Sequence, residues 1–365
     1  MIADPFLAGI QTERIERYLK SVLGDGITVT GISPLGGGDS SKGFGYGTPL
    51  RVDYKLQGRE LRRVVLHTMA AGAFGHEHMA DRARILLWSH HAFNRLPRHV
   101  RSLDVGGFEQ DGSLISLGGV EELCLLTEYA EGQAYASDLV RLRDSGQAND
   151  LDLRRADALC DYLVGIHRAP VDNAELYVRR LRELAGDGEC IMGLADSYPD
   201  HPLFTPRVLE QIEHSAVAWR WRLKNRTQRL RQVHGDFHPW NILFAPGLDF
   251  RLLDRSRGEY GDPADDVTCL TANYLFFSLQ RSGRLEGIFE ILFRRFWTRY
   301  LEKSGDRDML SVAGPFFAFR ALVMASPVWY PHLSDDVREK LLHFILNVLE
   351  TDRLDPALVN TYCGA

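Results

Sequence analysis

The order of apolar and polar residues divides the chain into an N-terminal part with mostly strand patterns and a longer C-terminal part with mostly helix patterns. Residues 12–22 place apolar side chains at helical spacing, which predicts an amphipathic leading helix. Residues 27–32 alternate between apolar and polar positions. The apolar runs 50–56 and 63–67 flank Gln57-Gly58, a pair typical of tight hairpin turns, so the three segments predict an antiparallel sheet.

The pattern changes further along the chain. Residues 77–93 keep a helical stripe of apolar side chains, and the short runs 114–117 and 123–126 predict further strands. Beyond Gly132 helical spacing dominates. The expected fold class is α+β. Residues 1–128 would form an antiparallel sheet with a leading helix and one main helix, and residues 129–365 a larger, mostly helical part.

Composition fits a globular protein with a large core. The 365 residues are 45% hydrophobic and 25% charged, which is enough for two lobes or more. A net charge of -6 argues against a general nucleic-acid binder. The five cysteines form no CxxC pair, and charged residues interrupt the apolar segment 10–23 before it reaches the length of a signal peptide or membrane span. We therefore expect a cytoplasmic protein with free thiols and with neither nucleic acid nor membrane as a partner.

One segment carries the spacing that phosphoryl transfer requires. Asp236 and Asn241 lie five residues apart, at the start of the apolar run 241–244. In kinase catalytic loops an aspartate faces the acceptor hydroxyl, and an asparagine five positions later holds a magnesium ion on the nucleotide phosphates. A turn at Pro246-Gly247 joins this run to residues 250–253, so the sequence predicts a hairpin that brings Asp254 back to the same site.

The motif His234-Gly-Asp-Phe-His-Pro-Trp-Asn241 resembles the catalytic loop of the aminoglycoside phosphotransferase and choline kinase superfamily. The likeness continues in Gly261-Asp-Pro-Ala-Asp-Asp266, in the helix expected over 159–167, and in Leu126-Thr-Glu-Tyr-Ala-Glu-Gly132, which is similar to the hinge between that family's lobes. The resemblance implies a two-lobed protein-kinase-like fold. It also implies ATP-dependent transfer of the γ-phosphate to a hydroxyl of a small molecule, with GTP as the alternative nucleotide.

The resemblance assigns roles to single residues. It implies that Asp236 orients the acceptor hydroxyl and takes its proton late in the reaction. Asn241 and Asp254 are implied as the ligands of Mg2+, and Glu128 and Ala130 as hinge residues that bind the nucleotide. The catalytic loop and its hairpin, residues 234–254, would thus belong to the C-terminal lobe, together with a helical subdomain that binds the acceptor.

A glycine-rich segment, Leu35-Gly-Gly-Gly-Asp-Ser-Ser-Lys-Gly-Phe-Gly-Tyr-Gly47, separates the first two predicted strands. Glycine lets main-chain amides approach phosphate oxygens closely, and kinases cover the nucleotide phosphates with such a loop in the first hairpin of the N-terminal sheet. A flexible hairpin connection is the simpler alternative. The residues expected to contact the phosphates are Gly37, Gly38, Ser40, Ser41 and Lys42.

One residue departs from the family pattern. His67 stands where the family's third strand carries a lysine that contacts the phosphates and pairs with a helix glutamate, here Glu77. Either His67 acts as an imidazolium whose pKa is raised by Glu77 and the triphosphate, or Lys42 supplies the charge, or the chain is a pseudokinase. The intact catalytic loop favours the first two explanations. Arg62 and Arg63 are weaker candidates because they face elsewhere on the strand.

The two histidines of the catalytic motif raise a second chemistry. His234 and His238 lie four residues apart, a spacing that suits a metal pair on a helix. Gly235 and Pro239 deny them a shared helix face, so zinc is not expected. The family resemblance implies a scaffold role for His234.

The charged residues after the hairpin are also candidates for a role in the site. Asp262 is expected to cap the following helix and to brace the catalytic loop. Arg255 and Arg257 directly follow the metal aspartate. They either recognise an anionic acceptor or the transferred phosphate, or they pair with Glu259 and Asp265 at the surface.

The sequence does not identify the acceptor, which the family resemblance places in the aminoglycoside, choline or homoserine class. Acceptor choice in the family depends on the helical part of the large lobe, here 268–362. Two prolines exclude a helix over 326–332, which puts Trp329, Tyr330 and His332 on a loop that could form a pocket wall. A monomer or homodimer is expected. The rival functions are a nucleotide-binding pseudokinase and a kinase-fold nucleotidyltransferase; residues 254–261 lack the activation-loop signature of a protein kinase.

Overall fold

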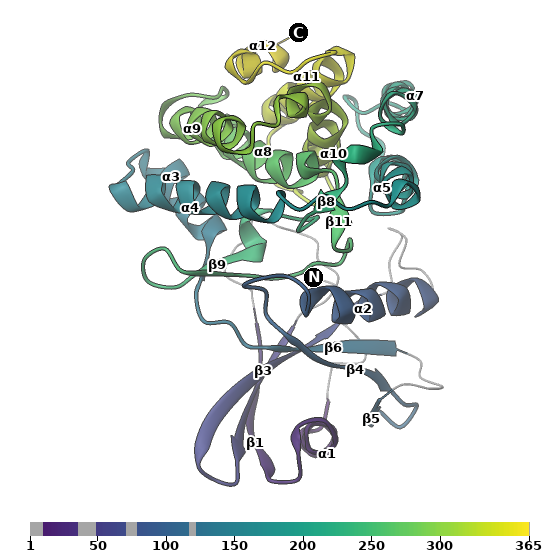
Figure 1. The fold of residues 1–365 in the computed structure, drawn as a ribbon, viewed down its shortest axis with the longest axis vertical. Coiled ribbons are helices and arrows are strands. Elements are labelled where there is room, and N and C mark those ends of the chain that lie inside the picture. Colours follow the sequence, from purple (N-terminus) through teal and green to yellow (C-terminus); the bar gives the residue numbers. More distant parts are fainter. Residues whose placement is uncertain (1–9, 36–48, 71–78, 117–121, 365) are drawn as a thin grey trace. The chain divides into compact units, whose positions relative to one another are not determined.

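The computed structural model describes residues 10–35, 49–70, 79–116 and 122–364. The chain forms two compact units, which Figure 1 shows as ribbons. The first contains Met1–Glu131 together with Arg251–Arg257, and the second contains Gly132–Phe250 and Gly258–Ala365. The short segment 251–257 therefore belongs to the first unit, although in sequence it lies between the two segments of the second unit.

The first unit is built on a six-stranded sheet with the strand order β1-β2-β3-β6-β4-β5, in which neighbouring strands are antiparallel. Gln57 and Gly58 both take positive φ angles, 49° and 70°, as a tight hairpin turn requires, and they join β2 to β3 as predicted. The strands are β1 Ile27–Pro34, β2 Leu50–Leu56, β3 Glu60–Thr68, β4 Ser102–Phe108, β5 Leu114–Ile115 and β6 Glu122–Glu128.

Two helices cover opposite faces of this sheet. Helix α1, Thr12–Leu23, packs its apolar stripe against Cys124 and Leu126 of β6. Helix α2, Met79–Phe93, contributes to a second cluster with Leu125, which points to the other face because side chains alternate along a strand. The predicted helices are thus both present, each bound to the sheet by its own apolar cluster.

Strand β4 was not predicted from the sequence. Two adjacent glycines, Gly106 and Gly107, interrupt its apolar pattern and argue against a strand. The structure supplies the reason for the first of them. A Cβ atom on Gly106 would lie 2.5 Å from the hydroxyl oxygen of Tyr18, so α1 can lie close to β4 only where the side chain is a hydrogen atom.

The second unit is mostly helical, as expected. Its main helices are α3 Tyr135–Ser145, α4 Asp150–Ile166, α5 Ala174–Gly186, α6 Ile191–Ser197, α7 Pro206–Leu223, α8 Pro263–Ser282, α9 Gly287–Ser304, α10 Ala313–Ala325, α11 Asp335–Glu350 and α12 Val359–Tyr362. The short elements are β7 Gln133–Ala134, η1 Thr227–Arg229, β8 Arg231–Gln232, η2 Pro239–Asn241, β9 Ile242–Phe244, β10 Phe250–Leu252, β11 Tyr260–Gly261, η3 Arg307–Ser311 and η4 Pro356–Leu358. The predicted hairpin is present: β9 and β10 are neighbouring strands, and the amide of Ala245 donates to the carbonyl of Asp249 at 2.9 Å.

Helix α8 is the centre of the second unit. Its side chains are buried on all sides along most of its length, and Figure 1 shows it among α3, α9 and α10, which all contact it. Asp262 is its N-cap and Pro263 its first residue, so the start of α8 is fixed by the sequence. Within the described residues, no helix combines the length and apolar character that crossing a membrane requires.

The loop 326–332 is not helical, as its two prolines predict, but of its three ring-bearing candidates only His332 is exposed. Trp329 and Tyr330 are each 7% exposed, and the ring of Tyr330 packs on Phe276 of α8 with 4.9 Å between ring centroids. These two side chains are therefore part of the helical core.

Candidate active site

The catalytic segment lies between β8 and β9 and turns sharply at Gly235. The φ angle of Gly235 is 87°, a conformation that favours glycine. The amide of Asp236 then donates to Nδ1 of His234 at 3.3 Å, and the amide of His238 donates to the carbonyl of Asp236 at 2.9 Å. Pro239 begins the short helix η2. The sequence therefore folds this segment into a compact loop held by its own side chains.

The predicted pair of Asp236 and Asn241 is brought together by this loop. Nδ2 of Asn241 donates to the main-chain oxygen of Asp236 at 3.0 Å and approaches the carboxylate oxygen Oδ2 at 3.4 Å. Because the amide nitrogen is engaged with Asp236, the amide oxygen is the atom of Asn241 suited to a hard metal ion. Asn241 is buried, with 8% of its surface exposed.

The loop is held in place by hydrogen bonds to the fully buried carboxylate of Asp266 in α8. Its carboxylate accepts the amides of His234 and Gly235 at 2.8 and 2.7 Å, and its Oδ2 lies 3.1 Å from Nε2 of His167. Burial alone would raise the pKa of Asp266, but the contacts with His167 and His234 outweigh burial, and the pKa is lowered. Asp266 is thus a charged anchor for two consecutive amides of the catalytic loop.

Sequence reasoning gave this bracing role to Asp262, which the structure corrects. Asp262 does cap α8, since its Oδ1 accepts the amide of Ala264 at 2.9 Å. Its other contacts are with Arg229 and Tyr177, at 2.7 and 2.9 Å. The amides of the catalytic loop donate to Asp266 instead, because at this position in the first turn of α8 the carboxylate faces the loop. His234 is fully buried beneath the loop, in keeping with a scaffold residue.

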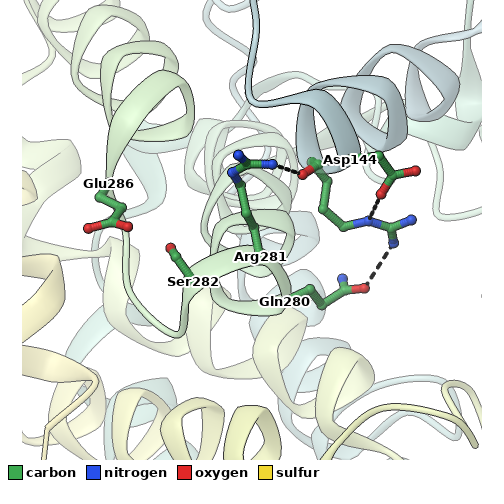
Figure 2. A pocket seen from close by; sticks show the side chains of 6 residues that line it. Asp144, Gln280, Arg281, Ser282 and Glu286 are labelled. Carbon is green, nitrogen blue, oxygen red and sulfur yellow. Dashed lines mark hydrogen bonds and ion pairs between the residues drawn. The ribbon is translucent and has the colours of Figure 1, made fainter.

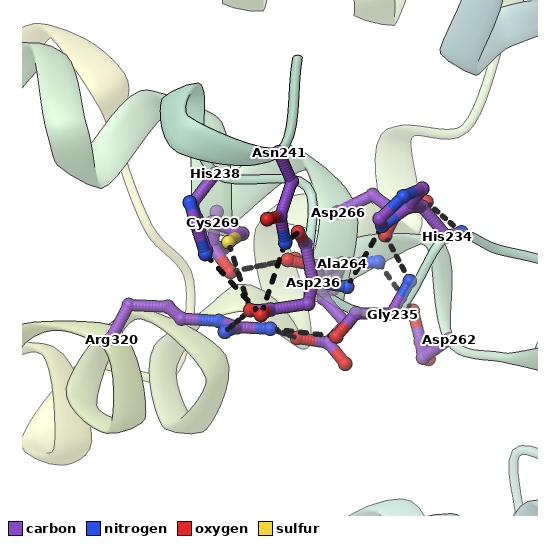
Figure 3. A network of polar contacts seen from close by, with 12 residues as sticks. His234, Gly235, Asp236, His238, Asn241, Asp262, Ala264, Asp266, Cys269 and Arg320 are labelled. Carbon is purple, nitrogen blue, oxygen red and sulfur yellow. Dashed lines mark hydrogen bonds and ion pairs between the residues drawn. The ribbon is translucent and has the colours of Figure 1, made fainter. Parts of the chain in front are cut away.

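Arg320 of α10 is a site residue that the sequence analysis missed. Its Nη1 donates to Oδ1 of Asp236 at 2.6 Å, and its Nη2 contacts Oδ1 of Asp265 at 2.5 Å and the carbonyl of Gly235 at 3.0 Å (Figure 3). Arg320 is 5% exposed. A signal was available, because Arg320 is the only charged residue in the apolar helix Ala313–Ala325. Burying a charged side chain is costly unless it is paired or hydrogen-bonded, so a lone arginine in an apolar helix indicates polar or anionic partners elsewhere in the fold.

Two further side chains border the carboxylate of Asp236. Nε2 of His238 lies 3.4 Å from Oδ2, while its Nδ1 accepts the amide of Trp240 at 3.2 Å. The thiol of Cys269 lies 3.9 Å from Oδ1. Burial raises the pKa of this thiol well above its ordinary value, so the sulfur is protonated at neutral pH. Among the described residues, the carboxylate of Asp236 therefore lies next to the guanidinium group of Arg320 and the neutral thiol of Cys269.

In the first unit, His67 lies on β3 with Nε2 3.2 Å from the hydroxyl of Thr127. Burial lowers its pKa from an ordinary 6.5 to about 4. With burial as its only cause, this shift leaves the ring neutral at pH 7. The expected imidazolium depends on Glu77 and a bound triphosphate, and it stays a prediction. The other expected phosphate-contacting residues, Gly37, Gly38, Ser40, Ser41 and Lys42, and the partner Glu77, lie outside the described residues.

The two arginines that precede His67 on strand β3 form ion pairs with carboxylates. Arg62 contacts Glu60 at 3.0 Å, and Arg63 contacts both Asp53, at 3.3 Å, and Glu131. From the sequence, both arginines rank below His67 and Lys42 as sources of a phosphate-binding charge. The ion pairs agree with this ranking, because each guanidinium group already has an anionic partner.

The hinge residues are placed by β6. Glu128 is its last residue, and its amide donates to the carbonyl of Arg101 at 2.9 Å. Ala130 packs against the apolar cluster that contains Leu125. Their contact with a nucleotide remains a prediction.

Asp254 has an unusual main-chain conformation. Its φ angle is 47°, one of three positive values among the described non-glycine residues, and its Oδ1 accepts the amide of Ser256 at 3.2 Å. Such conformations are uncommon and recur at functional sites. Asp254 belongs to the first unit and Asn241 to the second, and their joint binding of a metal ion remains a prediction.

Arg255, the next residue, is fully buried and donates from Nη1 to the carbonyl of Ala92 at 2.9 Å. This contact fixes the guanidinium group to a main-chain oxygen of α2, which favours a structural role for Arg255. Recognition of an anion by Arg255 stays a prediction.

A separate polar pocket of about 470 Å³ lies in the second unit between the end of α3 and the end of α8 (Figure 2). Its arginines are used within the protein. Arg143 contacts Asp144 and Gln280 at 2.8 and 3.2 Å, and Arg281 contacts the carbonyl of Arg143. It is lined by Arg143, Asp144, Gln280, Arg281, Ser282 and Glu286, none of which was a predicted site residue.

Comparison with solved structures shows the fold. Amicoumacin kinase hAmiN, in complex with AMP-PNP, Ca2+ and Ami, is 13% identical, with a TM-score of 0.53 and coverage of 90% of this chain and 91% of that chain. Choline kinase from Cryptosporidium parvum Iowa II is 11% identical, with a TM-score of 0.51 and coverage of 97% and 93%. The aminoglycoside phosphotransferase APH(4)-Ia is 15% identical, with a TM-score of 0.47 and 97% coverage of both chains. The predicted kinase-like α+β fold is thereby confirmed.

The sequence itself decides the family. No curated protein matches this chain. The model of the phosphotransferase enzyme family matches residues 53–300, a span that includes the hinge, the catalytic loop and the start of α8. Because this span is more than half of the chain, the protein belongs to the phosphotransferase enzyme family and is a small-molecule kinase.

Proposed function

We propose that this kinase transfers the γ-phosphate of ATP to a hydroxyl group of a small molecule, with GTP as the alternative nucleotide. The observation that carries the proposal is the Asp236–Asn241 pair, joined by hydrogen bonds of 3.0 and 3.4 Å within a loop anchored on buried Asp266. Phosphoryl transfer depends mainly on positioning and on neutralising charge, and this loop positions a carboxylate and an amide with little freedom to move.

In this proposal Asp236 orients the acceptor hydroxyl and accepts its proton late in the transfer. Asn241 and Asp254 would hold one or two Mg2+ ions, which fits their oxygen atoms. A bound Mg2+ supplies charge neutralisation at the phosphates. Asp254→Ala should then remove Mg2+-dependent nucleotide binding in a calorimetric titration, and an unchanged affinity for Mg-ATP would count against the metal assignment.

Nucleotide binding is proposed for the hinge residues Glu128 and Ala130 and for the glycine-rich loop with Lys42. The similar structure of amicoumacin kinase is described with AMP-PNP and Ca2+, which supports a nucleotide together with a divalent cation. The acceptor remains open. Choline kinase and amicoumacin kinase are named for small hydroxylated molecules, and an acceptor of the aminoglycoside, choline or homoserine class is proposed here.

The test is nucleotide consumption in the presence of a panel of small hydroxyl compounds, with the product mass determined. A product heavier by one phosphate group supports the proposal, and Asp236→Asn should form none of it. A product heavier by a nucleoside monophosphate would instead establish a nucleotidyltransferase. Nucleotide binding without consumption of any acceptor would contradict the proposal.

A pseudokinase is a second candidate because burial lowers the pKa of His67, which makes this residue a weaker substitute for the family's lysine. Lys42→Ala decides between the candidates. If Lys42 contacts the phosphates, its loss should weaken nucleotide binding by about 1.5 to 3 kcal/mol, the range for hydrogen bonds to charged groups. His67→Ala, as the matched change, should have a much smaller effect. Weak binding that neither substitution alters would favour the pseudokinase.

A further inference from the structure

The two oxygens of the Asp236 carboxylate have different surroundings. Oδ1 receives the Nη1 donor of Arg320 at 2.6 Å and lies 3.9 Å from the thiol of Cys269. Oδ2 faces Nδ2 of Asn241 and Nε2 of His238, each at 3.4 Å. One oxygen is thus fixed by a short, charge-assisted contact, whereas these two contacts of the other oxygen, with described residues of the second unit, are longer and weaker.

We propose that Arg320 is the positioning residue of the reaction, and that by holding Oδ1 it assigns Oδ2 as the oxygen that receives the acceptor's proton. This inference rests on the proposed function, since it names the atom by which Asp236 would act. In the transfer, the acceptor oxygen forms a bond to the γ-phosphorus. The bond from that phosphorus to the β–γ bridging oxygen breaks, its electrons pass to the nucleoside diphosphate, and the hydroxyl proton passes to Oδ2.

The guanidinium group suits this role because of its shape. Its two terminal nitrogens contact the side chain of Asp236, the side chain of Asp265 and the main-chain carbonyl of Gly235, and Figure 3 shows Arg320 beside Asp236 and Gly235. The carbonyl of Gly235 belongs to the peptide group just before Asp236. Arg320 therefore fixes both the main chain and the side chain of the catalytic residue.

The second carboxylate, Asp265, makes this arrangement rigid. Asp265 lies in the first turn of α8, next to the loop-bracing Asp266, and anchors Nη2 of Arg320 at 2.5 Å. Without the arginine, two carboxylates would face each other across a largely buried space and would repel. The orientation of Asp236 would then no longer be set by α10.

A lysine could not replace this contact fully. An ammonium group is a compact charge that cannot hold two carboxylates and a carbonyl in a fixed plane. Arg320→Lys should keep the charge and lose much of the orientation. Arg320→Met should lose both. A misplacement of a reacting group by about 1 Å is enough to lower a rate about 100-fold.

Arg229 provides a matched control in the same unit. It is also a buried arginine that bridges two aspartates, Asp262 at 2.7 Å and Asp306 at 2.9 Å, but its contacts do not include the catalytic loop. Arg229→Lys disturbs an ion-pair network of the same kind. It measures the general effect of loosening the helical core.

The first measurement is the conformation of Asp236 in crystal structures of Arg320→Lys, Arg320→Met and Arg229→Lys, which requires no activity. The carboxylate should rotate in both Arg320 variants and keep its native orientation in Arg229→Lys. An unchanged Asp236 in the Arg320 variants would overturn the inference. This outcome is independent of the proposed function, whose own failure would show as a wild-type enzyme that phosphorylates no acceptor.

The second measurement separates kcat from KM with the acceptor found by the panel. Arg320→Met should lower kcat about 100-fold, with Arg320→Lys between it and the wild type. KM for the nucleotide should change little. Guanidinium ion added to Arg320→Ala should raise kcat, because it restores the missing group, and it should not affect Arg229→Lys. Equal losses of kcat in the Arg320 and Arg229 variants, without rescue, would show a merely structural role.

Discussion

The carboxylate of Asp236, the proposed catalytic group, is fixed by its neighbours in the absence of substrate. Arg320 holds one of its oxygens at 2.6 Å, and the amide of Asn241 binds its main-chain carbonyl at 3.0 Å. Such pre-organisation reduces the reorganisation that the chemical step requires. At the residue scale, the site therefore depends on which atoms of Asp236 already form hydrogen bonds, as well as on which residues are present.

Asp236→Asn should abolish transfer and leave nucleotide affinity nearly intact. An amide cannot accept the hydroxyl proton, and loss of such a base typically costs about 100-fold to 10,000-fold in rate. The kcat for the acceptor and a calorimetric titration with Mg-ATP measure the two effects separately. Undiminished turnover would rule out Asp236 as the base.

His67 gives the first unit a pH dependence of stability. Its folded pKa of about 4 lies below the ordinary 6.5, so between these values the unfolded chain binds more protons than the folded one. The stability contributed by His67 is present above pH 6.5 and is lost as pH falls toward 4. In urea unfolding of the first unit's sheet, His67→Gln should therefore be less sensitive than the wild type to a change from pH 7 to pH 5. Equal sensitivity would mean that the pKa of His67 is not lowered in the folded protein.

At the scale of elements, the buried carboxylate of Asp266 in helix α8 accepts two main-chain amides of the catalytic loop. Asp266→Ala would leave the amides of His234 and Gly235, and the ring of His167, without their shared acceptor. Breaking such a buried pair costs about 3 to 5 kcal/mol. Urea unfolding of the second unit measures this loss.

Asp157 offers the control for that experiment. It pairs with Arg295 across α4 and α9 at 2.6 Å, and the arginine side chain is 44% exposed. Asp157→Ala should cost at most about 1 kcal/mol, as exposed pairs do. Similar losses in the two variants would show that Asp266 is no special anchor.

Two glycines in different elements predict opposite effects of the same substitution. Gly106→Ala in β4 would place a methyl group 2.5 Å from the hydroxyl oxygen of Tyr18, and overpacking of this kind costs about 1 to 3 kcal/mol. Gly165 lies in α4 with no atom within 4 Å of an added Cβ. Gly165→Ala should stabilise by about 0.5 to 1 kcal/mol, since alanine is the better helix former. Thermal unfolding of both variants tests the pair, and a destabilised Gly165→Ala would contradict it.

The elements that could be predicted from the sequence are those that are determined by residues close together in the chain. The Gln57-Gly58 hairpin and the hairpin after Asn241 follow from turn residues flanked by apolar runs. Strand β4 was missed because the reason for Gly106 is Tyr18, which is 88 positions away in sequence and belongs to a different element. A pattern along the chain does not carry that information.

The same limit applied to the candidate site. Asp236 and Asn241 were predicted because their spacing is part of one loop. Arg320 was missed because its partner lies 84 positions earlier, although a lone arginine in an apolar helix was a visible signal. Asp266 was confused with Asp262 because both lie at the start of α8, and only the geometry of the first turn decides which carboxylate faces the loop.

At the scale of the whole molecule, the two units are not separate stretches of sequence. The first unit includes Arg251–Arg257, which lies between two pieces of the second. This segment is integrated into the first unit, since Leu252 forms a parallel bridge with His99 and Arg255 donates to the carbonyl of Ala92. The chain therefore passes between the units three times, after residues 131, 250 and 257.

This interleaving has a consequence for synthesis on the ribosome. When the first 131 residues have emerged, the sheet of the first unit can form, but Arg255 and the strand segment beside His99 have not yet been translated. At about 5 to 20 residues per second, the missing piece follows only after several seconds. During that interval the carbonyl of Ala92 has no guanidinium donor, so the nascent small unit must persist in an unfinished form that a chaperone could recognise.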